Sequence, residues 1–454
     1  MRNLSPVFFG FAFARACNDA FFYYLGSALP LGTWAGQDVL SMAMLVVFIA
    51  AILLARKLAP LYLRQGFIWA SAALMSVAAF CLWGWQSTGV IELALVAAIA
   101  GGFGSALAIL LWSELQCCFG SLLIVVYIAG GFFFGSLLGW AIVGLEGPRM
   151  AAVLIACALA SSLCLRSGFP LIQECDLPRK SWGKVRFPWK LVLVLGVYAF
   201  VIGVREVVAS SGDGTMFLLG VLVSALIVFI AAYFSPEKLD FMLIFRAPFA
   251  LVVCGLLFAL LALPLGDAVS GFLSSLGYSM MFTLITVLMC DISHRYGVSV
   301  LVLCGIKELS AIGLIAGHSC AAAGVAGVLP LPPDSQTAEV ILTGFVVLAS
   351  VFLLFGSKDE RWGLEFFGVD RLAAEGDAQG VFVLRCNELA DMHHLSPRER
   401  EVFQLLALGK SPVSIEKELC IANGTLKSHT RRIYQKLGIH SREELRTLVG
   451  DVPK

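Results

Sequence analysis

Long apolar runs recur along the first 356 residues of the chain and are separated by short polar stretches. Each run approaches the roughly 20 residues that a helix needs to cross a bilayer. We therefore predict twelve membrane-spanning helices, at 7–29, 37–55, 66–86, 89–112, 118–143, 149–166, 190–210, 215–234, 240–263, 267–290, 297–320 and 337–356. The longest polar connection, 167–189, divides this membrane domain (1–356) into two six-helix halves, 1–166 and 190–356.

The Lys and Arg residues of the loops are placed unevenly between the two sides of the membrane. If the N-terminus is cytoplasmic, only Arg149 falls in an outer loop. The inner loops then hold eleven cations, namely Arg56, Lys57, Arg64, Arg166, Arg179, Lys180, Lys184, Arg186, Lys190, Lys238 and Arg295. Because Lys and Arg accumulate in cytoplasmic loops, we predict this orientation. An even number of spans then places the C-terminus in the cytoplasm as well.

The pattern changes near the C-terminus, where 395–449 reads LSPREREVFQLLALGKSPVSIEKELCIANGTLKSHTRRIYQKLGIHSREELRTLV. Apolar positions now recur at helical spacing in a mostly polar chain, which is typical of a small water-soluble helical domain. Ser396 with Glu399, and Ser441 with Glu444, match the Ser-x-x-Glu capping box that begins a helix. We predict four short helices in this stretch, the first and the fourth starting at these boxes.

The third of these helices, from about 423 to 437, carries the candidate chemistry. Apolar residues keep helical spacing on one side of it, while Lys427, Ser428 and Arg431 lie on another side. The domain 395–454 has eleven Lys or Arg against seven Asp or Glu, and the excess lies after residue 426. A helix held by two others, with cations and short polar groups along one ridge, fits the DNA major groove.

Together these residues resemble the LuxR/NarL-type helix-turn-helix family of bacterial transcription regulators. The shared pattern, LSPREREV…L…G…I…L.I..GT.K.H...IY.KLG…SR.E, runs through the whole stretch. The resemblance implies base-edge contacts from Lys427, Ser428 and Arg431. It implies that four further residues lie near phosphates: Thr425, Thr430, Arg432 and Lys436. It also implies that the fourth helix supports a homodimer on double-stranded DNA.

The start of the third helix departs from the family pattern. Ala422 and Asn423 stand where the family usually has Ser-Glu or a similar pair. We therefore expect this helix to lack its usual N-cap, and Asn423 to serve as a cap one residue late.

Composition indicates a membrane protein with a small soluble domain. The 454 residues are 59% hydrophobic and only 14% charged, whereas a soluble protein carries about 25% charged residues. The expected fold class is all-α: a twelve-span bundle followed by a four-helix domain.

The six-plus-six layout with a basic central loop resembles the major facilitator architecture. The loop RKLAPLYLRQG lacks the Gly-x-x-x-Asp-Arg-x-Gly-Arg signature usual in such transporters, so the resemblance implies the fold and leaves transport open.

No enzyme motif accompanies these features. The sequence contains no P-loop, Gly-x-Ser-x-Gly or His-Glu-x-x-His segment, and its thirteen cysteines form no Cys-x-x-Cys pair. We therefore expect neither catalysis nor a metal or cofactor site. The connection 357–394 is too short for a soluble sensor domain and is expected to be a linker. A signal must therefore reach the DNA-binding domain through the membrane domain or this linker.

Several ionisable residues fall inside the predicted spans: Arg15, Asp19, Arg205, Glu206, Arg246, Lys307 and Glu308. An ionised side chain at mid-bilayer costs at least about 2.5–3.5 kcal/mol, so each needs a partner or water. Arg15 and Asp19 are one helical turn apart and can pair within one helix. Because the first and seventh spans occupy equivalent places in the two halves, we expect these residues to converge near the centre of the bundle, where Lys307 and Glu308 join them.

Two interpretations of this polar cluster remain open. It forms either a pocket that binds a small ligand, anions included, or a set of interhelical salt bridges that hold the halves together. Proton coupling through Asp19 or Glu308 is a third interpretation.

These observations favour a membrane-bound one-component transcriptional regulator in the bacterial inner membrane, with both termini in the cytoplasm. Its membrane domain is expected to sense an unidentified small-molecule ligand. Its C-terminal domain is expected to bind promoter DNA as a homodimer and to engage RNA polymerase. The alternative is a secondary transporter with a regulatory DNA-binding tail, and uptake of a labelled solute discriminates between the two.

Overall fold

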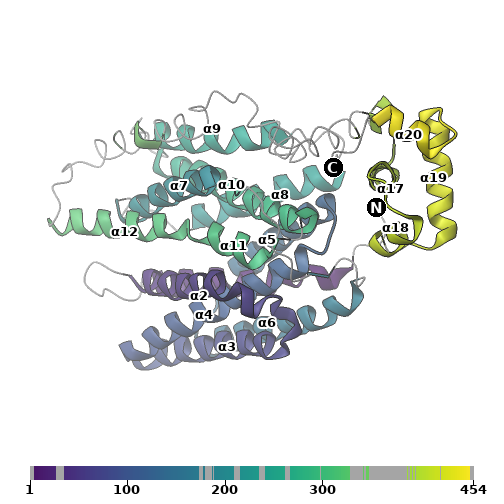
Figure 1. Cartoon of the computed structure of the whole chain (residues 1–454). Coiled ribbons are helices and arrows are strands. Elements are labelled where there is room, and N and C mark those ends of the chain that lie inside the picture. Colours follow the sequence, from purple (N-terminus) through teal and green to yellow (C-terminus); the bar gives the residue numbers. More distant parts are fainter. Residues whose placement is uncertain are drawn as a thin grey trace. The chain divides into compact units, whose positions relative to one another are not determined.

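The structure, a computed structural model, divides the chain into two compact units, residues 1–357 and 358–454. The residues that it describes are 5–26, 35–172, 189–208, 215–234, 241–260, 266–296, 298–327 and 395–449 except Cys420, with a few isolated positions between them. Within these ranges every regular element is a helix, which confirms the all-α prediction (Figure 1).

The first half of the membrane unit consists of six long helices. They are α1 (Phe11–Gly26), α2 (Gly36–Leu58), α3 (Gln65–Thr88), α4 (Ile91–Gln116), α5 (Ser121–Val143) and α6 (Gly147–Gly168), with 3-10 turns at Pro6–Phe9, Leu61–Leu63 and Phe169–Leu171. Local chemistry sets some of their ends. Gly89 ends α3 with φ 70°, a conformation that strains a residue bearing a Cβ. Pro148 lies in the first turn of α6, where its missing N–H costs nothing.

The second half has a two-residue turn within the eleventh predicted span. Its helices are α7 (Trp189–Val208), α8 (Thr215–Phe234), α9 (Phe241–Leu260), α10 (Gly266–Tyr296), α11 (Val300–Glu308) and α12 (Ala311–Val325). The eleventh predicted span is interrupted after Glu308, where the backbone hydrogen bonds shorten to three-residue spacing. The eleventh predicted span, 297–320, nevertheless corresponds to the segment Val300–Gly324, which is long and apolar enough to cross a membrane. The twelfth predicted span, 337–356, lies outside the described residues except for 341 and 344–346.

Close packing of α12 on α7 accompanies this break. A Cβ at Gly313 would collide with the carbonyl oxygen of Gly196, and one at Gly317 would collide with that of Phe200. The two backbones therefore touch without intervening side chains, which is possible only with glycine at these points. This close contact holds α12 against α7.

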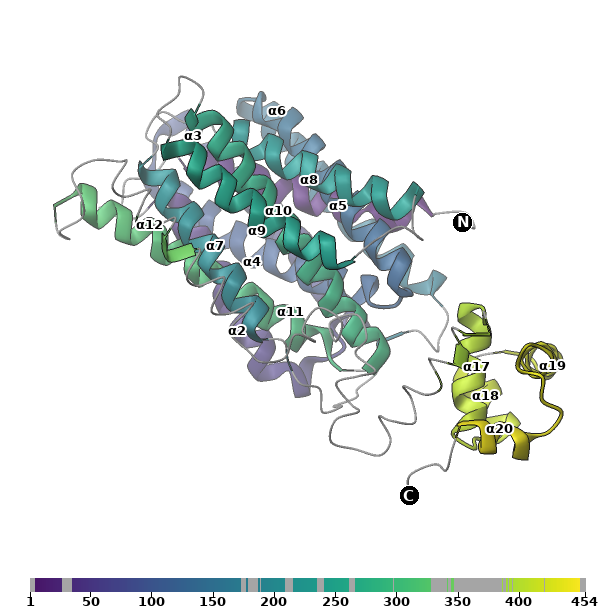
Figure 2. The same cartoon turned by 90° about the horizontal axis from the view of Figure 1, so that it is seen from above.

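The two halves meet along two sets of helices. Helix α5 packs against α8 and α10, and α2 packs against α11 and α12. Figure 1 shows α2, α3, α4 and α6 on one side of this junction and α7, α9 and α10 on the other. In Figure 2, seen from above, α9 and α10 lie in front of α4. Aromatic rings cross it as well: Phe9 and Phe134 lie 6.4 and 6.2 Å from the ring of Phe229 in α8. Side chains of these helices therefore line the space between the halves.

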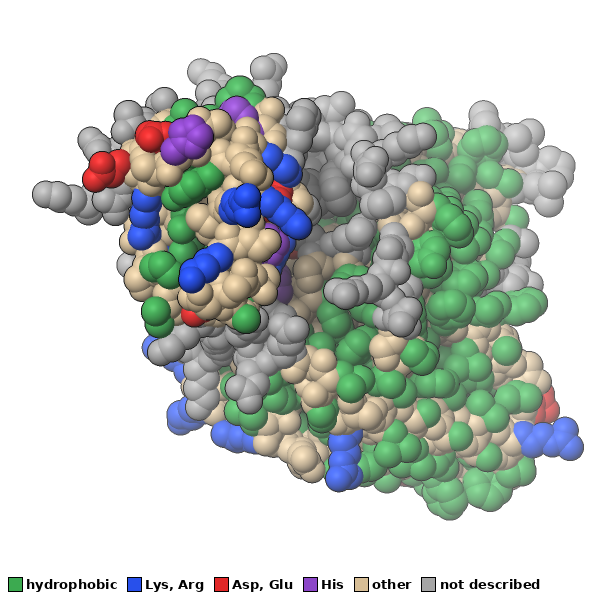
Figure 3. Space-filling view, turned by 90° about the vertical axis from the view of Figure 1, so that its right-hand side faces the viewer, with side chains coloured by type: hydrophobic (Ala, Val, Ile, Leu, Met, Phe, Trp, Pro, Cys, Tyr) green, Lys and Arg blue, Asp and Glu red, His purple; other side chains and the backbone are tan. Residues whose placement is uncertain are grey.

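The outside of the membrane unit is apolar, as a bilayer requires. Among the described residues, seven helical segments are long and apolar enough to cross a membrane: Gly36–Leu58, Gln65–Thr88, Ile91–Gln116, Leu123–Val143, Gly147–Leu171, Ala268–His294 and Val300–Gly324. Large side chains such as Leu53 and Phe80 are 74% and 59% exposed on them. Figure 3 shows hydrophobic side chains covering the visible face of this unit. The chain is therefore a multi-pass membrane protein.

The C-terminal unit contains the four helices that the sequence predicts. They are α17 (Pro397–Ala407), α18 (Pro412–Leu419), α19 (Asn423–Leu437) and α20 (Arg442–Val449). Each helix contributes to one core, in which seven residues have no exposed surface: Ala390, Val402, Phe403, Ala407, Ile415, Ile433 and Leu445. Removal of this apolar surface from water stabilises the domain without help from the membrane unit.

The predicted capping box is present at α17, whereas at α20 Ser441 caps the helix but the Glu444 carboxylate bonds the preceding residue. At α17, the Glu399 backbone N–H donates to Ser396 Oγ at 3.3 Å, and the Ser396 N–H donates to Glu399 Oε2 at 2.9 Å. At α20, the Glu444 N–H donates to Ser441 Oγ at 3.1 Å, while the Glu444 carboxylate accepts the N–H of His440 at 2.9 Å. These bonds satisfy N–H groups that the first helical turn leaves unpaired.

Candidate functional site

Helix α19 presents an apolar side to the core and a polar side to solvent. Leu426 and Ile433 are buried in the domain core, and α17 and α18 pack against this side. The three predicted base-contact residues, Lys427, Ser428 and Arg431, are exposed. The side of α19 that is predicted to enter the major groove is therefore accessible, while its opposite side packs against α17 and α18.

Three of the four predicted phosphate-contact residues lie on the same helix with different exposure. Thr425 and Arg432 are exposed. Thr430 is half-buried, and its hydroxyl donates to the Leu426 carbonyl at 2.9 Å, within the helix. The structure thus leaves Thr425 and Arg432 accessible to an approaching phosphate.

The fourth, Lys436, joins α19 to the start of α17. Its Nζ lies 2.7 Å from Glu399 Oε2, and the Glu399 residue is only 4% exposed. Burial raises the pKa of the Glu399 carboxyl, but hydrogen bonds from Lys436 and Ser396 outweigh burial, so its pKa is lowered overall. Lys436 therefore stabilises the domain through this ion pair. The ion pair competes with a contact from Lys436 to a DNA phosphate.

The N-terminus of α19 has no side-chain cap, as the sequence predicts. Ala422 occupies the N-cap position in an extended conformation (φ −69°, ψ 151°). The expected late cap at Asn423 is wrong. Asn423 is already helical, and its Nδ2 donates to Glu416 Oε1 in α18 at 2.5 Å, a charge-assisted bond.

An open groove of about 790 Å³ lies beside α19 and is lined by apolar residues such as Leu406 and Ile439 as well as by polar ones. Lys427, Thr430 and Arg431 of α19 line it, with Pro412 of α18 and Arg442 of α20. Figure 3 shows several Lys and Arg side chains gathered on the visible face of this domain. A concave surface edged with cations attracts a polyanion such as DNA.

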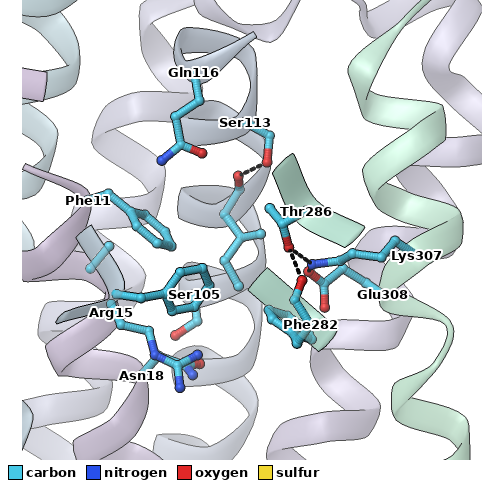
Figure 4. Close-up of a pocket in the computed structure, with 13 residues that line it drawn as sticks. Phe11, Arg15, Asn18, Ser105, Ser113, Gln116, Phe282, Thr286, Lys307 and Glu308 are labelled. Carbon is cyan, nitrogen blue, oxygen red and sulfur yellow. Dashed lines mark hydrogen bonds and ion pairs between the residues drawn. The ribbon is translucent and has the colours of Figure 1, made fainter. Parts of the chain in front are cut away.

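A small cavity lies between the two halves of the membrane unit. Its volume is about 30 Å³, which is room for about two water molecules. Polar and aromatic side chains from both halves line it (Figure 4). Figure 4 shows Arg15 and Asn18 toward one end, Gln116 at the other, and Lys307 with Glu308 on a facing helix.

Each cation at this cavity has its own carboxylate. Arg15 Nη2 lies 2.8 Å from Asp19 Oδ1, and this pairing within α1 confirms the prediction from their spacing. Lys307 Nζ lies 2.5 Å from Glu308 Oε1. The structure therefore brings these four predicted residues to one region as two neutral pairs.

Arg205 and Glu206 do not line this cavity. Arg205 donates to the hydroxyls of Ser270 and Ser274 in α10, the latter at 2.9 Å. Glu206 Oε2 instead accepts Gln37 Nε2 of α2 at 3.0 Å. Adjacent positions of a helix point about 100° apart, so these two residues of α7 reach different neighbours.

The expectation that all the intramembrane charges converge at one point is therefore wrong for Arg205 and Glu206. The side chain of Arg246, in α9, lies outside the described residues.

A further polar contact between the halves is not among the predicted ones. His318 Nδ1 of α12 lies 2.8 Å from Asp38 Oδ2 of α2. The same carboxylate oxygen accepts the N–H of Ala35 at 2.8 Å and so caps α2. Asp38 and His318 both fall inside predicted spans, and that placement was the signal available in the sequence.

Comparison with known proteins finds different similar proteins for the C-terminal unit and for the membrane unit. Residues 393–449 match the family described as bacterial regulatory proteins, luxR family. The chain is 48% identical over 48 residues to the probable transcriptional regulatory protein NarL of Mycobacterium tuberculosis (strain ATCC 25618 / H37Rv), covering 11% of this chain and 22% of that protein. It is 42% identical over 50 residues to the spore germination protein GerE of Bacillus subtilis (strain 168), covering 11% of this chain and 68% of GerE. The chain thus spans about a fifth of NarL and about two thirds of GerE.

The membrane unit matches a solved transporter in fold. The human organic anion transporter MFSD10 (TETRAN) superposes with a TM-score of 0.58 at 16% identity, covering 76% of this chain and 97% of that chain. The membrane unit is therefore a major-facilitator-like helix bundle.

Proposed function

The chain belongs to the luxR family of bacterial regulatory proteins through its C-terminal domain, and we propose that it is a membrane-bound one-component transcriptional regulator. A domain of this family implies binding to DNA. In the proposal, the major-facilitator-like bundle senses a small molecule, and the C-terminal domain binds promoter DNA as a homodimer and engages RNA polymerase.

The exposed ridge of α19 is the observation that carries the proposal. Lys427 and Arg431 are one helical turn apart, and both side chains are exposed beside Ser428. Long cationic side chains at this spacing can each donate two hydrogen bonds to guanine in the major groove. Thr425 and Arg432 flank them and support contacts to phosphates, which fix register without reading sequence.

The proposed signal is a change in how the two halves of the bundle pack. A ligand that binds one packing more tightly than another shifts the population toward it. The connection after residue 357 then carries the change to the C-terminal domain and alters how two such domains pair on a palindromic site.

A double substitution tests the DNA-binding role directly. Each good base contact contributes roughly 1–3 kcal/mol of discrimination, so Lys427→Ala with Arg431→Ala is expected to weaken specific binding at least about tenfold. The assay is electrophoretic retardation by the full-length protein in lipid nanodiscs, with promoter fragments first identified by genome-wide crosslinking. Membrane insertion should be unchanged.

The matched control removes the same charge elsewhere. Lys57→Ala with Arg149→Ala takes two exposed cations from the membrane unit and should leave specific retardation intact. If the α19 double variant still retards promoter fragments like the unaltered protein, α19 is not the recognition helix.

The membrane fold favours a second candidate, a secondary transporter whose tail reports on substrate flux. Sustained accumulation of a labelled solute by vesicles, driven by a proton or sodium gradient, would support this candidate. Saturable binding without accumulation would support the regulator.

A further inference from the structure

Helices α3 and α6 pack side by side in the first half of the membrane unit (Figure 1). Tyr62, just before α3, stacks on Phe169, just after α6, with ring centroids 4.5 Å apart. Deeper in the pair, Ser162 Oγ of α6 donates to the carbonyl oxygen of Ile68 in α3 at 3.1 Å. Residue numbers rise along one helix as they fall along the other, so the two helices are antiparallel at these contacts.

Two arginines fall between these two contacts. Arg64 immediately precedes α3, and Arg166 lies in the last turn of α6. Both residues are exposed, and both belong to the predicted inner loops. The packing of α3 on α6 therefore brings two cations to the same end of the helix pair. Like charges at one place repel each other, and a bound anion relieves that repulsion.

The contacts of these arginines leave their charges unneutralised. Arg64 Nη2 donates to the carbonyl oxygen of Lys57 at 3.0 Å. The guanidinium carbon of Arg166 lies 5.9 Å from the centre of the Trp69 ring. In the described part of the chain, no carboxylate lies within ion-pair distance of either arginine. A guanidinium group matches the geometry of a phosphate, to which it can donate two hydrogen bonds.

The loop that carries Arg64 is held in place by a buried carboxylate. Glu114 of α4 is 1% exposed and accepts the backbone N–H groups of Leu61 and Tyr62 at 2.7 and 2.9 Å. The two oxygens of this carboxylate are thus occupied by the backbone of the loop. Because the loop is already fixed, binding a ligand at Arg64 costs less conformational entropy.

Apolar side chains lie beside the arginines on the outer surface of the same helix pair. Leu63 and Leu163 are 64% and 54% exposed, and the Trp69 side chain is exposed as well. Tryptophan is enriched where lipid headgroups meet the hydrocarbon core. A soluble anion or a nucleic acid would leave these apolar side chains uncovered. A phospholipid can cover them with its acyl chains while its phosphate meets the arginines.

We infer that this surface, formed by Arg64, Trp69, Leu163 and Arg166, binds an anionic phospholipid. The phosphate diester of the lipid contacts the two guanidinium groups, and its acyl chains lie along Trp69 and Leu163. The inference concerns the membrane unit alone and does not depend on DNA binding by the C-terminal domain.

Native mass spectrometry of the full-length protein tests the inference. The protein in detergent micelles is titrated with phosphatidylglycerol or with phosphatidylcholine of identical acyl chains. Because basic residues near the membrane surface attract anionic lipids, the first phosphatidylglycerol should bind at least about tenfold more tightly than the first phosphatidylcholine. Equal affinities would overturn the inference. Glycerol 3-phosphate carries the phosphate without acyl chains and should not compete at millimolar concentration. Full competition would show a site for soluble anions and would overturn the lipid assignment.

Substitutions at the two ends of α6 locate the site. Arg64→Gln with Arg166→Gln should weaken phosphatidylglycerol binding at least about tenfold and leave phosphatidylcholine binding unchanged. Arg166→Gln alone should weaken it at least about threefold, which still tests the site if the double variant does not fold. Arg149→Gln, at an exposed position in the first turn of α6, is the matched control and should have no effect. If the Arg64 and Arg166 variants bind phosphatidylglycerol like Arg149→Gln, the inference fails.

DNA binding by the same variants separates a lipid site from a nucleic-acid site. In nanodiscs of phosphatidylcholine alone, Arg64→Gln with Arg166→Gln should retard promoter fragments like the unaltered protein. Weaker retardation in these neutral nanodiscs would mean that the two arginines contact DNA, and the lipid assignment would be overturned.

Discussion

Lys436 and Arg432 are both cations of α19, but they have different surroundings. Lys436 lies 2.7 Å from the buried carboxylate of Glu399, whereas Arg432 is exposed. Both residues are predicted from the sequence to lie near phosphates. Spacing along a helix shows which side of the helix a residue occupies. Spacing does not show which residue of α17 lies opposite. The role of Lys436 therefore became visible only with the packing of α17 on α19.

Lys436→Ala is expected to destabilise the C-terminal domain by about 1–3 kcal/mol, because it leaves a buried carboxylate with fewer partners. Urea unfolding of residues 358–454 measures the change. Arg432→Ala is the control and should change stability by less than about 0.5 kcal/mol. It should instead reduce the slope of the logarithm of DNA affinity against the logarithm of salt concentration by about one. Equal destabilisation by both variants would contradict this division of roles.

The Glu399 carboxyl also gives the domain a defined acid dependence. Its pKa is lowered in the folded state, mainly because bonds from Lys436 and Ser396 outweigh burial. The stabilisation is therefore present above the unfolded pKa of about 4.3 and is lost as the pH falls through the folded pKa.

Glu399→Gln should therefore flatten the loss of stability below about pH 4.3. The free energy of unfolding of residues 358–454, measured by urea between neutral and acidic pH, tests this expectation. Some acid dependence should remain, because the N–H of His440 and the hydroxyl of Ser441 also lower the pKa of Glu444. If Glu399→Gln loses stability at acidic pH as much as the unaltered protein does, Glu399 is not the source of this acid dependence.

At the scale of elements, helices with local start and stop signals were predicted closely, whereas contacts between distant segments were not predicted. The caps at Ser396 and Ser441 involve residues within one turn, so the sequence specifies them. The close approach of Gly313 in α12 to Gly196 in α7 joins segments more than a hundred residues apart, so local sequence patterns do not reveal it. The pair of Asp38 with His318 was missed for the same reason.

The uncapped start of α19 gives a prediction at this scale. Ala422 already has the extended backbone of an N-cap residue, so Ala422→Ser should supply the missing bond without strain. A good N-cap contributes typically about 1 kcal/mol, and thermal unfolding of residues 358–454 should show that gain. Ser396→Ala in α17 is the reciprocal control and should lose a similar amount. No gain in Ala422→Ser would mean that solvent already satisfies this helix end.

At the scale of the whole molecule, charge distribution predicts the orientation in the membrane. Eleven cations fall in the predicted inner loops and one in the outer loops, so the C-terminus is expected in the cytoplasm. Green fluorescent protein fused after Lys454 should therefore fluoresce. Alkaline phosphatase inserted in the connection between α5 and α6 should be active, because it folds only outside the cytoplasm. The reverse pattern would remove the C-terminal domain from the chromosome and would end the proposed regulatory function.

One chain contains both the membrane bundle and the C-terminal domain, and this covalent link restricts where a dimer can assemble. If the protein binds a palindromic operator as the proposed homodimer, its half-sites lie about 34 Å apart, and two copies must diffuse together in the plane of the bilayer before both can bind. The encounter is a two-dimensional search along the envelope. Only a promoter that approaches the membrane can be reached, and the folding of the nucleoid then helps to decide when the target gene responds.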